Sequence, residues 1–318
     1  MLGFIGYWFL LALASSLFII LEYVPAILMQ REVEKRRLDC RERMSKSSTC
    51  SSTEGTMLTN SINLGSAFVL ITGGSEGIGR GFAERFIKKG ADVLVTGRAQ
   101  NRLDRIAGEL PGIRTFRNDI SRPDERIRLA EFLRSEFPNL NLLINNAGIQ
   151  RRISLAADDA PWAERQAEID TLLSGPIHLN HLLVPLMLQH GQPSLIVNVT
   201  SGGAFIPQVF APTYSACKAA LHSYTMTLRA ALHETSIRVV ELIPPAVQTG
   251  LSGSGAPHGA PLDQFCDSVF SALAAEGDTI GFGPTDTPEF RELIGTVETL
   301  FKQRSANFNV KTYASTDK

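Results

Sequence analysis

Apolar residues follow two different patterns along this chain. One unbroken apolar run covers residues 2–21, and Glu22 is the first charged residue. From residue 66 onward the apolar residues form short runs that alternate with amphipathic segments. Short apolar runs are typical of strands that are covered on both faces, and alternation with helices is typical of a doubly wound parallel sheet. The pattern therefore predicts an α/β fold with a single sheet domain behind a separate N-terminal segment.

The predicted elements of this domain follow directly from the pattern. Helices are expected between the strands, and the carboxyl ends of parallel strands are where such folds bind ligands. No second domain or internal repeat is indicated. The predicted strands are Ala67–Thr72, Asp92–Thr96, Ile113–Arg117, Leu140–Asn145, Leu195–Thr200, Arg238–Ile243 and, weakly, Thr279–Phe282. The predicted helices are Arg80–Lys89, Asn101–Leu110, Asp124–Phe137, Ala163–Gln189 and Tyr214–Glu234.

Residues 2–21 are long enough to cross a membrane. Twenty helical residues span about 30 Å, the thickness of a bilayer core. Basic residues cluster just after the run, from Arg31 to Lys46, which places the following chain in the cytosol. A cleaved signal peptide is the alternative, and it fits less well because no basic residue precedes the run. We therefore expect a single-pass transmembrane helix within residues 1–30.

Between the anchor and the folded domain the composition changes again. Residues 31–60 are first charged and then rich in serine and threonine, which predicts a flexible linker. The folded domain is expected over residues 61–303, and residues 304–318 form a C-terminal tail. A product that starts at Met57 would lack the anchor, so we expect it to be soluble and cytoplasmic.

Composition excludes several kinds of partner. The chain has 31 basic and 32 acidic residues, so no net charge favours a nucleic acid. The four cysteines show no metal-binding spacing and fit reduced thiols. His178 and His181 share one predicted helix, but no cysteine or carboxylate cluster joins them, so no metal site is predicted.

The first strong chemical signal is the stretch Thr72–Gly79, which has the spacing Thr-Gly-x-x-x-Gly-x-Gly. It lies between a predicted strand and a predicted helix. Glycine lets backbone N–H groups approach a phosphate closely, and the N-terminus of a helix favours an anion. An ordinary strand-to-helix turn is the alternative. If the stretch binds phosphate, its contacts come from Gly73, Ser75, Gly77, Ile78 and Gly79.

Unusual residues also follow the other predicted strands. Five such strand ends would meet at one rim of a parallel sheet, which favours a binding site over five unrelated turns. They carry Arg98, Asp119, the run Asn145-Asn146-Ala147-Gly148, the run Thr200–Gly203, and the run Pro244–Thr249.

Tyr214 and Lys218 lie four residues apart and so share one helical face. A fixed ammonium about 4 Å from the phenol contributes about 4 kcal/mol at an effective dielectric of 20. This would lower the pKa of Tyr214 and allow it to exchange a proton with an alcohol or carbonyl oxygen. Ser201 ends a predicted strand, and its hydroxyl can hydrogen-bond the same oxygen. An unrelated exposed Tyr and Lys is the alternative for the pair alone.

As a set, these motifs resemble the short-chain dehydrogenase/reductase family, and within it the DltE-type oxidoreductases, over about residues 57–294. The resemblance implies a Rossmann fold and hydride transfer between a nicotinamide and a carbonyl or hydroxyl carbon. It assigns Tyr214 as general acid/base, Lys218 as the residue that lowers its pKa and holds the nicotinamide ribose, and Ser201 as the residue that orients the substrate. It also implies cofactor contacts from Asn146, Ala147, Gly148, Val247 and Thr249.

The residue after the second predicted strand selects the cofactor. NAD-binding chains place an acid there, whereas this chain has Gly97 and then Arg98. A guanidinium suits a 2′-phosphate, so we expect NADP(H) rather than NAD(H). Glu76, inside the glycine turn, argues against this choice.

Leu172 is one departure from the family pattern. The family usually has an asparagine at this place, which holds a proton-relay water, and leucine cannot do so. Ser174 is a candidate substitute. The alternative function is therefore a catalytically weakened NADP-binding sensor or interaction protein.

Several features bear on the substrate. Residues 250–261 are rich in small residues and proline, which predicts either a lid or a plain surface loop. Phe205, Ile206, Val209 and Phe210 are candidates for an apolar pocket or for core. Arg151 and Arg152 either meet an anionic substrate or form a solvated pair, the favoured interpretation. The anchor suggests a lipophilic carbonyl or alcohol, and the family suggests a homo-oligomer.

Overall fold

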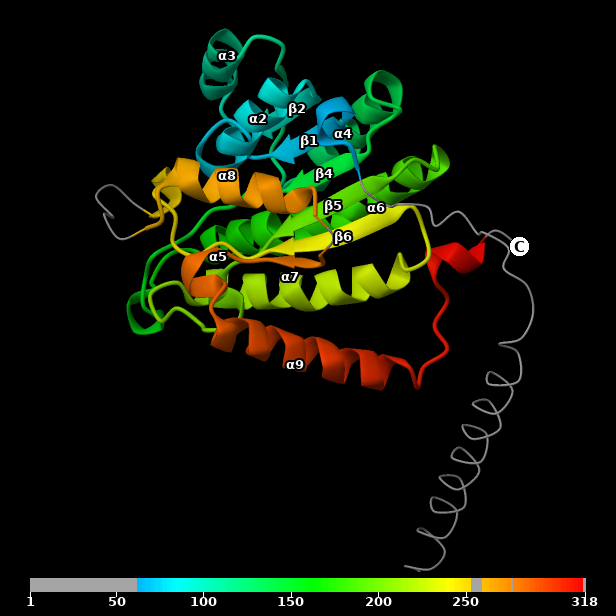
Figure 1. Cartoon of the computed structure of the whole chain (residues 1–318). Coiled ribbons are helices and arrows are strands. Elements are labelled where there is room, and N and C mark those ends of the chain that lie inside the picture. The colour runs from blue at the N-terminus through cyan, green and yellow to red at the C-terminus, as the bar shows by residue number, and fades with distance from the viewer. Residues whose placement is uncertain (1–61, 253–258, 276, 317–318) are drawn as a thin grey trace, which may run out of the picture. The chain divides into compact units, whose positions relative to one another are not determined.

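The computed structural model describes residues 62–252, 259–275 and 277–316. In this part of the chain, seven parallel strands form one sheet in the order β3-β2-β1-β4-β5-β6-β7 (Figure 1). The predicted anchor and linker lie outside the described residues. The strands are β1 (Phe68–Thr72), β2 (Asp92–Gly97), β3 (Arg114–Arg117), β4 (Leu142–Asn145), β5 (Ser194–Val199), β6 (Ile237–Leu242) and β7 (Thr279–Ile280).

Helices cover both faces of the sheet, as a doubly wound Rossmann fold requires. One face packs against α2 (Gly77–Lys89), α3 (Gln100–Glu109) and α8 (Leu262–Leu273). The other face packs against α4 (Pro123–Glu136), α6 (Gly175–Gln189) and α7 (Pro212–Ala231). The remaining helices are α5 (Trp162–Ile169), which leads into α6, and α9 (Pro288–Ser305), which lies alongside α7 in Figure 1.

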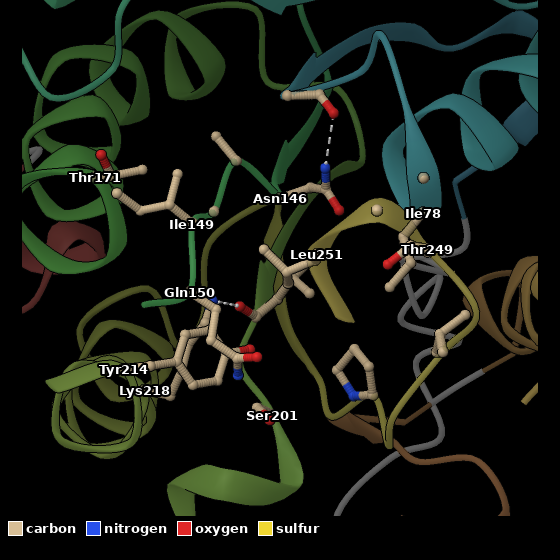
Figure 2. Close-up of a pocket in the computed structure, with 18 of the residues that line it drawn as sticks. Ile78, Asn146, Ile149, Gln150, Thr171, Ser201, Tyr214, Lys218, Thr249 and Leu251 are labelled. Atoms are coloured by element: carbon tan, nitrogen blue, oxygen red, sulfur yellow. Dashed lines mark hydrogen bonds between the residues drawn. The ribbon is translucent and has the colours of Figure 1, made fainter. Parts of the chain in front are cut away.

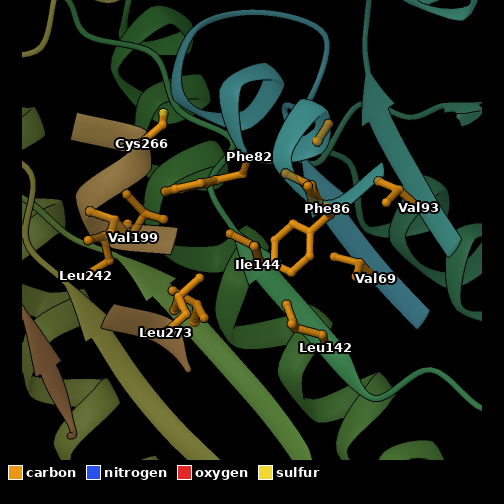
Figure 3. Close-up of a cluster of buried hydrophobic side chains, with 14 of the residues drawn as sticks. Val69, Phe82, Phe86, Val93, Leu142, Ile144, Val199, Leu242, Cys266 and Leu273 are labelled. Carbon is orange, nitrogen blue, oxygen red and sulfur yellow. The ribbon is translucent and has the colours of Figure 1, made fainter. Parts of the chain in front are cut away.

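The strands are apolar on both sides because each side meets a helical layer. Val69 points into the cluster with Phe82 and Phe86 of α2 (Figure 3). Ile71 belongs to the same cluster, whereas Leu70 between them packs on the opposite face. All five side chains are completely buried. Burying a side chain of this size stabilises the fold by about 1.5–3 kcal/mol, so the two layers hold the strand ends in fixed positions.

The seven predicted strands are confirmed, and each end lies within two residues of the predicted one. Two helices, α8 and α9, were not predicted. Only Phe290 and Ile294 of α9 are buried, so this helix carries a weak apolar stripe. Helix α9 continues to Ser305, two residues beyond residue 303.

The long helix predicted over Ala163–Gln189 is interrupted. α5 and α6 are joined by a π-helical turn, Asp170–Ser174, which contains Leu172. The combined stretch 162–189 is the one helix in the described part that is long and apolar enough to cross a membrane. Its apolar window is 56% buried inside the domain, where α6 packs against α4 and the sheet. This packing accounts for its apolar character.

Candidate active site

The predicted strand ends meet at one edge of the sheet and line a single cleft of about 1040 Å³ (Figure 2). Cofactor sites usually have volumes of up to about 1,000 Å³, so the cleft is large enough for a dinucleotide. Of the predicted site residues, Gly79 alone does not line it. The lining set includes Gly73, Ser75, Gly77, Ile78, Arg98, Asp119, Asn146, Ala147, Gly148, Ser201, Tyr214, Lys218, Val247 and Thr249.

The glycine turn requires its glycines. Gly73 adopts φ +64°, and a Cβ there would lie 2.8 Å from the Cα of Ala147. A Cβ on Gly79 would lie 2.5 Å from both Asn146 Nδ2 and the Gly73 carbonyl oxygen. Gly79 therefore acts behind the cleft, where it lets the turn pack against β4. The first N–H groups of α2 have no partner within the helix and remain available to a phosphate.

Hydrogen bonds join this turn to the end of β4. The Thr72 hydroxyl accepts from the backbone N–H groups of Asn146 and Ala147, both at 3.0 Å. The side-chain amide of Asn146 donates to the carbonyl oxygens of Thr72 and Gly73, at 3.0 and 3.1 Å. The two segments that would flank a bound dinucleotide are thus held together before it binds.

Positive charges at one end of the cleft would favour a cofactor that carries a 2′-phosphate. Arg98 lines the cleft together with Ser75, and within the described residues it has no ion pair. Glu76 binds two arginines of α3, Arg102 at 2.6 Å and Arg105 at 3.3 Å. Its carboxylate is therefore neutralised by charges from the neighbouring helix.

Tyr214 and Lys218 lie on one face of α7, as the spacing predicts, and Ser201 follows β5 nearby (Figure 2). Lys218 Nζ lies 5.7 Å from the centroid of the Tyr214 ring. It donates to the carbonyl oxygen of Val199 at 2.6 Å. All three side chains are buried, since their exposed fractions are 7% for Ser201, 7% for Tyr214 and 4% for Lys218.

Burial governs the titration of this pair. It raises the pKa of Tyr214, and contact with Ser201 acts in the opposite direction. Burial also lowers the pKa of Lys218 to about 8, because the charged form loses its hydration. Burial is thus the largest influence on both groups in the protein by itself, where the Lys218 ammonium donates to the Val199 carbonyl oxygen.

A buried polar network lies directly behind Ser201. The carboxylate of Glu241, in β6, is 1% exposed and accepts a hydrogen bond from the Thr200 hydroxyl at 2.7 Å. It also contacts His222 Nδ1 at 2.8 Å. The His222 ring in turn packs against Phe205, with centroids 4.5 Å apart. Because Thr200 precedes Ser201 in the chain, this network holds the backbone that carries the Ser201 hydroxyl.

Leu172 is buried and packs against Tyr214, outside the lining of the cleft. It packs in an apolar cluster with Ala211, Tyr214 and Cys217. It also borders a cavity of about 10 Å³ behind Lys218, which Asn145 lines as well. The side-chain oxygen of Asn145 has no hydrogen-bond partner in the described part of the chain. Leucine thus contributes packing at a place where the family pattern has a polar residue.

The substrate end of the cleft contains residues that the motifs did not reveal. Phe210 and Ile206 line it as expected, whereas Phe205 packs in the core and Val209 is 87% exposed. The predicted loop 250–261 is described only in part, and Leu251 lines the cleft. The additional lining residues include Gln150, Gln208, Thr285 and Phe290. Thr285 and Phe290 come from the C-terminal region, where no motif marks them.

The two neighbouring arginines have different environments. Arg151 donates to both carboxylate oxygens of Asp158, at 2.8 and 3.1 Å, and it also pairs with Glu164. These pairs raise the pKa of Arg151 and lower that of Asp158. Arg152 instead lines the cleft. The predicted solvated pair is therefore wrong for Arg151, which is held in ion pairs, whereas Arg152 is exposed at the cleft.

The residues present fit a dinucleotide cofactor. An added Cβ would clash with Ala147 at Gly73, and with Asn146 and the Gly73 carbonyl oxygen at Gly79, which accounts for the two glycines. The other glycine of the motif, Gly77, has φ +55° and lies open to the cleft beside Thr249. No cluster of metal-ligating side chains occurs among the described residues.

Sequence comparison agrees with this geometry. The model of the short chain dehydrogenase family matches residues 67–258. This chain belongs to the short-chain dehydrogenase/reductase family. It is 42% identical to the uncharacterized oxidoreductase DltE of Bacillus subtilis over 58% of this chain and 73% of that protein. It is 33% identical to the NADP-dependent 3-hydroxy acid dehydrogenase YdfG of Shigella flexneri, over 56% of this chain and 72% of that protein.

Comparison of structures confirms the fold. A short-chain dehydrogenase from Sphingobium yanoikuyae in complex with NADPH superimposes with a TM-score of 0.67. The match covers 79% of this chain and 99% of the other, at 24% sequence identity. This likeness shows the fold, and the family match identifies the chain as an NAD(P)-dependent short-chain dehydrogenase.

Proposed function

We propose that this chain is an NADP(H)-dependent oxidoreductase that interconverts a carbonyl and an alcohol, with Tyr214 as the general acid/base. The observation that supports this most directly is the convergence of Tyr214, Lys218 and Ser201 in one wall of a cleft whose far end carries the glycine turn and Arg98. Bound NADP(H) supplies the hydride donor or acceptor. The protein supplies the proton and holds the reacting oxygen.

The three side chains have distinct roles in this proposal. The Ser201 hydroxyl donates to the substrate oxygen and orients it. The Tyr214 hydroxyl gives a proton to that oxygen in reduction and takes it back in oxidation. Lys218 is buried close to the Tyr214 ring, so its ammonium stabilises the phenolate that forms when the proton has left.

The preference for NADP(H) over NAD(H) rests on charge. Arg98 lines the cleft without an acidic partner in the described chain, and its guanidinium suits the 2′-phosphate. Glu76, the residue that argued against this choice, is paired with Arg102 and Arg105. The relative YdfG is named as NADP-dependent and as acting on 3-hydroxy acids, which supports NADP(H) as cofactor and an alcohol or carbonyl compound as substrate.

A screen of carbonyl compounds for NADPH oxidation tests the proposal, with Tyr214→Phe as the matched control. The variant removes one oxygen atom, so we expect NADPH binding to remain while turnover falls by about 10³-fold or more. Equal turnover in the variant and the parent would overturn the assignment of Tyr214.

The alternative is an NADP-binding sensor with weakened catalysis, and Leu172 is the observation that favours it. Leu172 packs against Tyr214 and offers no polar atom to a relay water. The same screen separates the two functions. Tight NADPH binding together with no turnover of any carbonyl compound would favour the sensor.

We also propose that residues 2–21 anchor the protein in a membrane, with the dehydrogenase domain in the cytosol. The support is the length and apolar character of this run and the basic residues that follow it. Carbonate extraction of membranes tests the anchor. The full-length chain should stay with the membrane, and a chain that starts at Met57 should not. Release of the full-length chain by carbonate would contradict it.

A further inference from the structure

Arg152 lies at the substrate end of the cleft and not at the phosphate end. The chain runs from the end of β4 through Gly148 and Gln150 to Arg152, and all three line the cleft. Two hydrogen bonds join this segment to the loop after Ser201. Gln150 Nε2 donates to Gln208 Oε1 at 3.2 Å, and the N–H of Ile153 donates to the carbonyl oxygen of Phe210 at 2.9 Å. Arg152 is therefore held beside the loop that begins at Ser201.

The Arg152 side chain is exposed, and two contacts restrict the orientation of its guanidinium. Its central carbon lies 4.9 Å from the centroid of the Phe210 ring. Its Nε donates to Gln150 Oε1 at 3.1 Å. Stacking on an aromatic ring and a hydrogen bond at Nε hold the plane of the group, so less conformational entropy is lost when it binds a ligand.

The charge of Arg152 has no acidic partner among the described residues. In this part of the chain, no carboxylate lies within ion-pair distance of Arg152, and its two terminal nitrogens make no hydrogen bond. Arg151, next to it, shows the opposite pattern, with carboxylates from Asp158 and Glu164 around it. The difference indicates that the terminal nitrogens of Arg152 are available to a group that enters from the cleft.

Along the described lining of the cleft, no acidic side chain opposes this charge at the substrate end. The acidic residues that line the described cleft are Glu76 and Asp119. Glu76 is paired with arginines of α3, and Asp119 accepts from the backbone and hydroxyl of Ser121 at 3.1 and 2.7 Å. Lys218, the other cation near Tyr214, is directed at the Val199 carbonyl. An entering anion therefore meets Arg152.

We infer that Arg152 binds the carboxylate of the substrate, so that the preferred substrates are hydroxy or oxo acids. This inference rests on the proposed oxidoreductase function and specifies its substrate class. The two terminal nitrogens present the parallel donors that match the two oxygens of a carboxylate. Phe210 and Ile206 supply the apolar surface against which the carbon chain lies. The carboxylate thus fixes one end of the substrate while Ser201 and Tyr214 hold the reacting oxygen.

Paired substrates test the inference. Oxo acids of three to eight carbons are compared with their methyl esters, which keep the carbonyl but remove the charge. The parent enzyme should prefer the acids. Arg152→Gln should raise KM for the acids by about 10- to 100-fold, because hydrogen bonds to a charged group are lost, and should leave KM for the esters and for NADPH unchanged. Arg152→Lys should recover part of the loss.

A control variant distinguishes the loss of a carboxylate contact from a general loss of positive charge. Arg128 is an exposed arginine of α4 outside the cleft, so Arg128→Gln removes the same charge without touching the site. It should change no KM. Equal use of acids and esters by the parent, or equal loss of both in Arg152→Gln, would overturn the inference. A change in KM for NADPH alone would assign Arg152 to the cofactor and would also overturn it.

A binding measurement keeps the two proposals distinguishable. Calorimetric titration of the oxo acids into the enzyme saturated with NADP⁺ detects binding without turnover. Binding by the parent and not by Arg152→Gln supports the inference even where no compound is reduced, a result that would contradict the proposed catalysis alone. Absence of binding together with reduction of esters would contradict the inference alone.

Discussion

Glu76 Oε2 lies 2.6 Å from Arg102 Nη1, across the gap between the glycine turn and α3. Arg105 approaches the other carboxylate oxygen at 3.3 Å. These ion pairs are about half exposed, so each adds at most about 1 kcal/mol to stability. Their consequence is electrostatic. They offset the negative charge of Glu76 in the glycine turn, and Arg98, which lines the cleft unpaired in the described chain, is the cation to which we assign the preference for NADP(H).

The first prediction concerns Arg98. Arg98→Gln should raise KM for NADPH by about tenfold or more, because the cation facing the 2′-phosphate is lost. KM for NADH, which has no such phosphate, should change less than about twofold. Initial rates with the two cofactors measure this. Arg114→Gln is a matched control on β3, where the arginine pairs with Asp92. Parallel changes for both cofactors would contradict the assignment.

The second prediction concerns Glu76 itself. Glu76→Gln should release Arg102 and Arg105 toward the cleft and strengthen NADPH binding by about two- to tenfold, with no gain for NADH. Fluorescence titration of NADPH and NADH into the protein measures both affinities. If Glu76→Gln weakens NADPH binding instead, the ion pairs of Glu76 order the site, and its negative charge does not oppose binding of the cofactor.

The third prediction follows from the buried ammonium of Lys218, whose pKa is lowered to about 8. In the reductive direction, kcat/KM should fall as pH rises above about 8, because neutral Lys218 no longer stabilises the Tyr214 phenolate. Stability should change in the opposite direction. Between about pH 8 and 10.5 the unfolded chain binds more protons than the folded one, so the free energy of unfolding should rise by at most about 3 kcal/mol.

Urea unfolding at several pH values measures this rise, and Lys218→Met is its control. Methionine cannot titrate, so the contribution between pH 8 and 10.5 should disappear in this variant. A pH-independent difference between the two proteins over that range would show that Lys218 keeps its ordinary pKa in the folded chain.

The sheet and one wall of the site were predictable because each depends on local signals. Strands buried on both faces must be apolar, and the chemistry lies at strand ends that a parallel sheet brings together. Tyr214 and Lys218 were predictable because helical spacing alone places them on one face. The glycine turn was predictable for a similar reason, because a local backbone conformation selects glycine. Gly73 has a positive φ, which other residues rarely adopt.

The remaining features depend on tertiary contacts that no local pattern encodes. The neutralisation of Glu76 requires α3 to lie beside the glycine turn. The contrast between Arg151 and Arg152 depends on where Asp158 folds back. Phe290 reaches the cleft from α9, a helix whose apolar stripe is too weak to predict. In each case, two segments that are distant or unmarked in sequence had to be placed side by side.

The fourth prediction compares two glycines. Gly79→Ala should cost about 1–3 kcal/mol of stability, because its Cβ would lie 2.5 Å from Asn146 Nδ2 and from the Gly73 carbonyl oxygen. Relief of this clash would displace the glycine turn and should also weaken NADPH binding by about tenfold. Gly108→Ala in α3 meets nothing within 4 Å and should raise stability by up to about 1 kcal/mol. Urea unfolding and cofactor titration of both variants check this. Unchanged cofactor affinity in Gly79→Ala would remove the role given to this glycine.

The fifth prediction concerns the Thr200–Glu241–His222 network. Glu241→Leu leaves the Thr200 hydroxyl and His222 Nδ1 without their buried partner, so stability should fall by about 2–4 kcal/mol. Glu241→Gln keeps an oxygen for Thr200 and should lose less stability.

If the network positions Ser201, Glu241→Gln should lower kcat more than it changes KM for NADPH, because the Ser201 hydroxyl acts on the reacting oxygen and not on the cofactor. Thr200→Val removes the same hydrogen bond by deleting its donor. This variant and the double variant with Glu241→Gln should both have about the same kcat as Glu241→Gln alone. Full additivity of the two changes in kcat would show that Thr200 and Glu241 act independently.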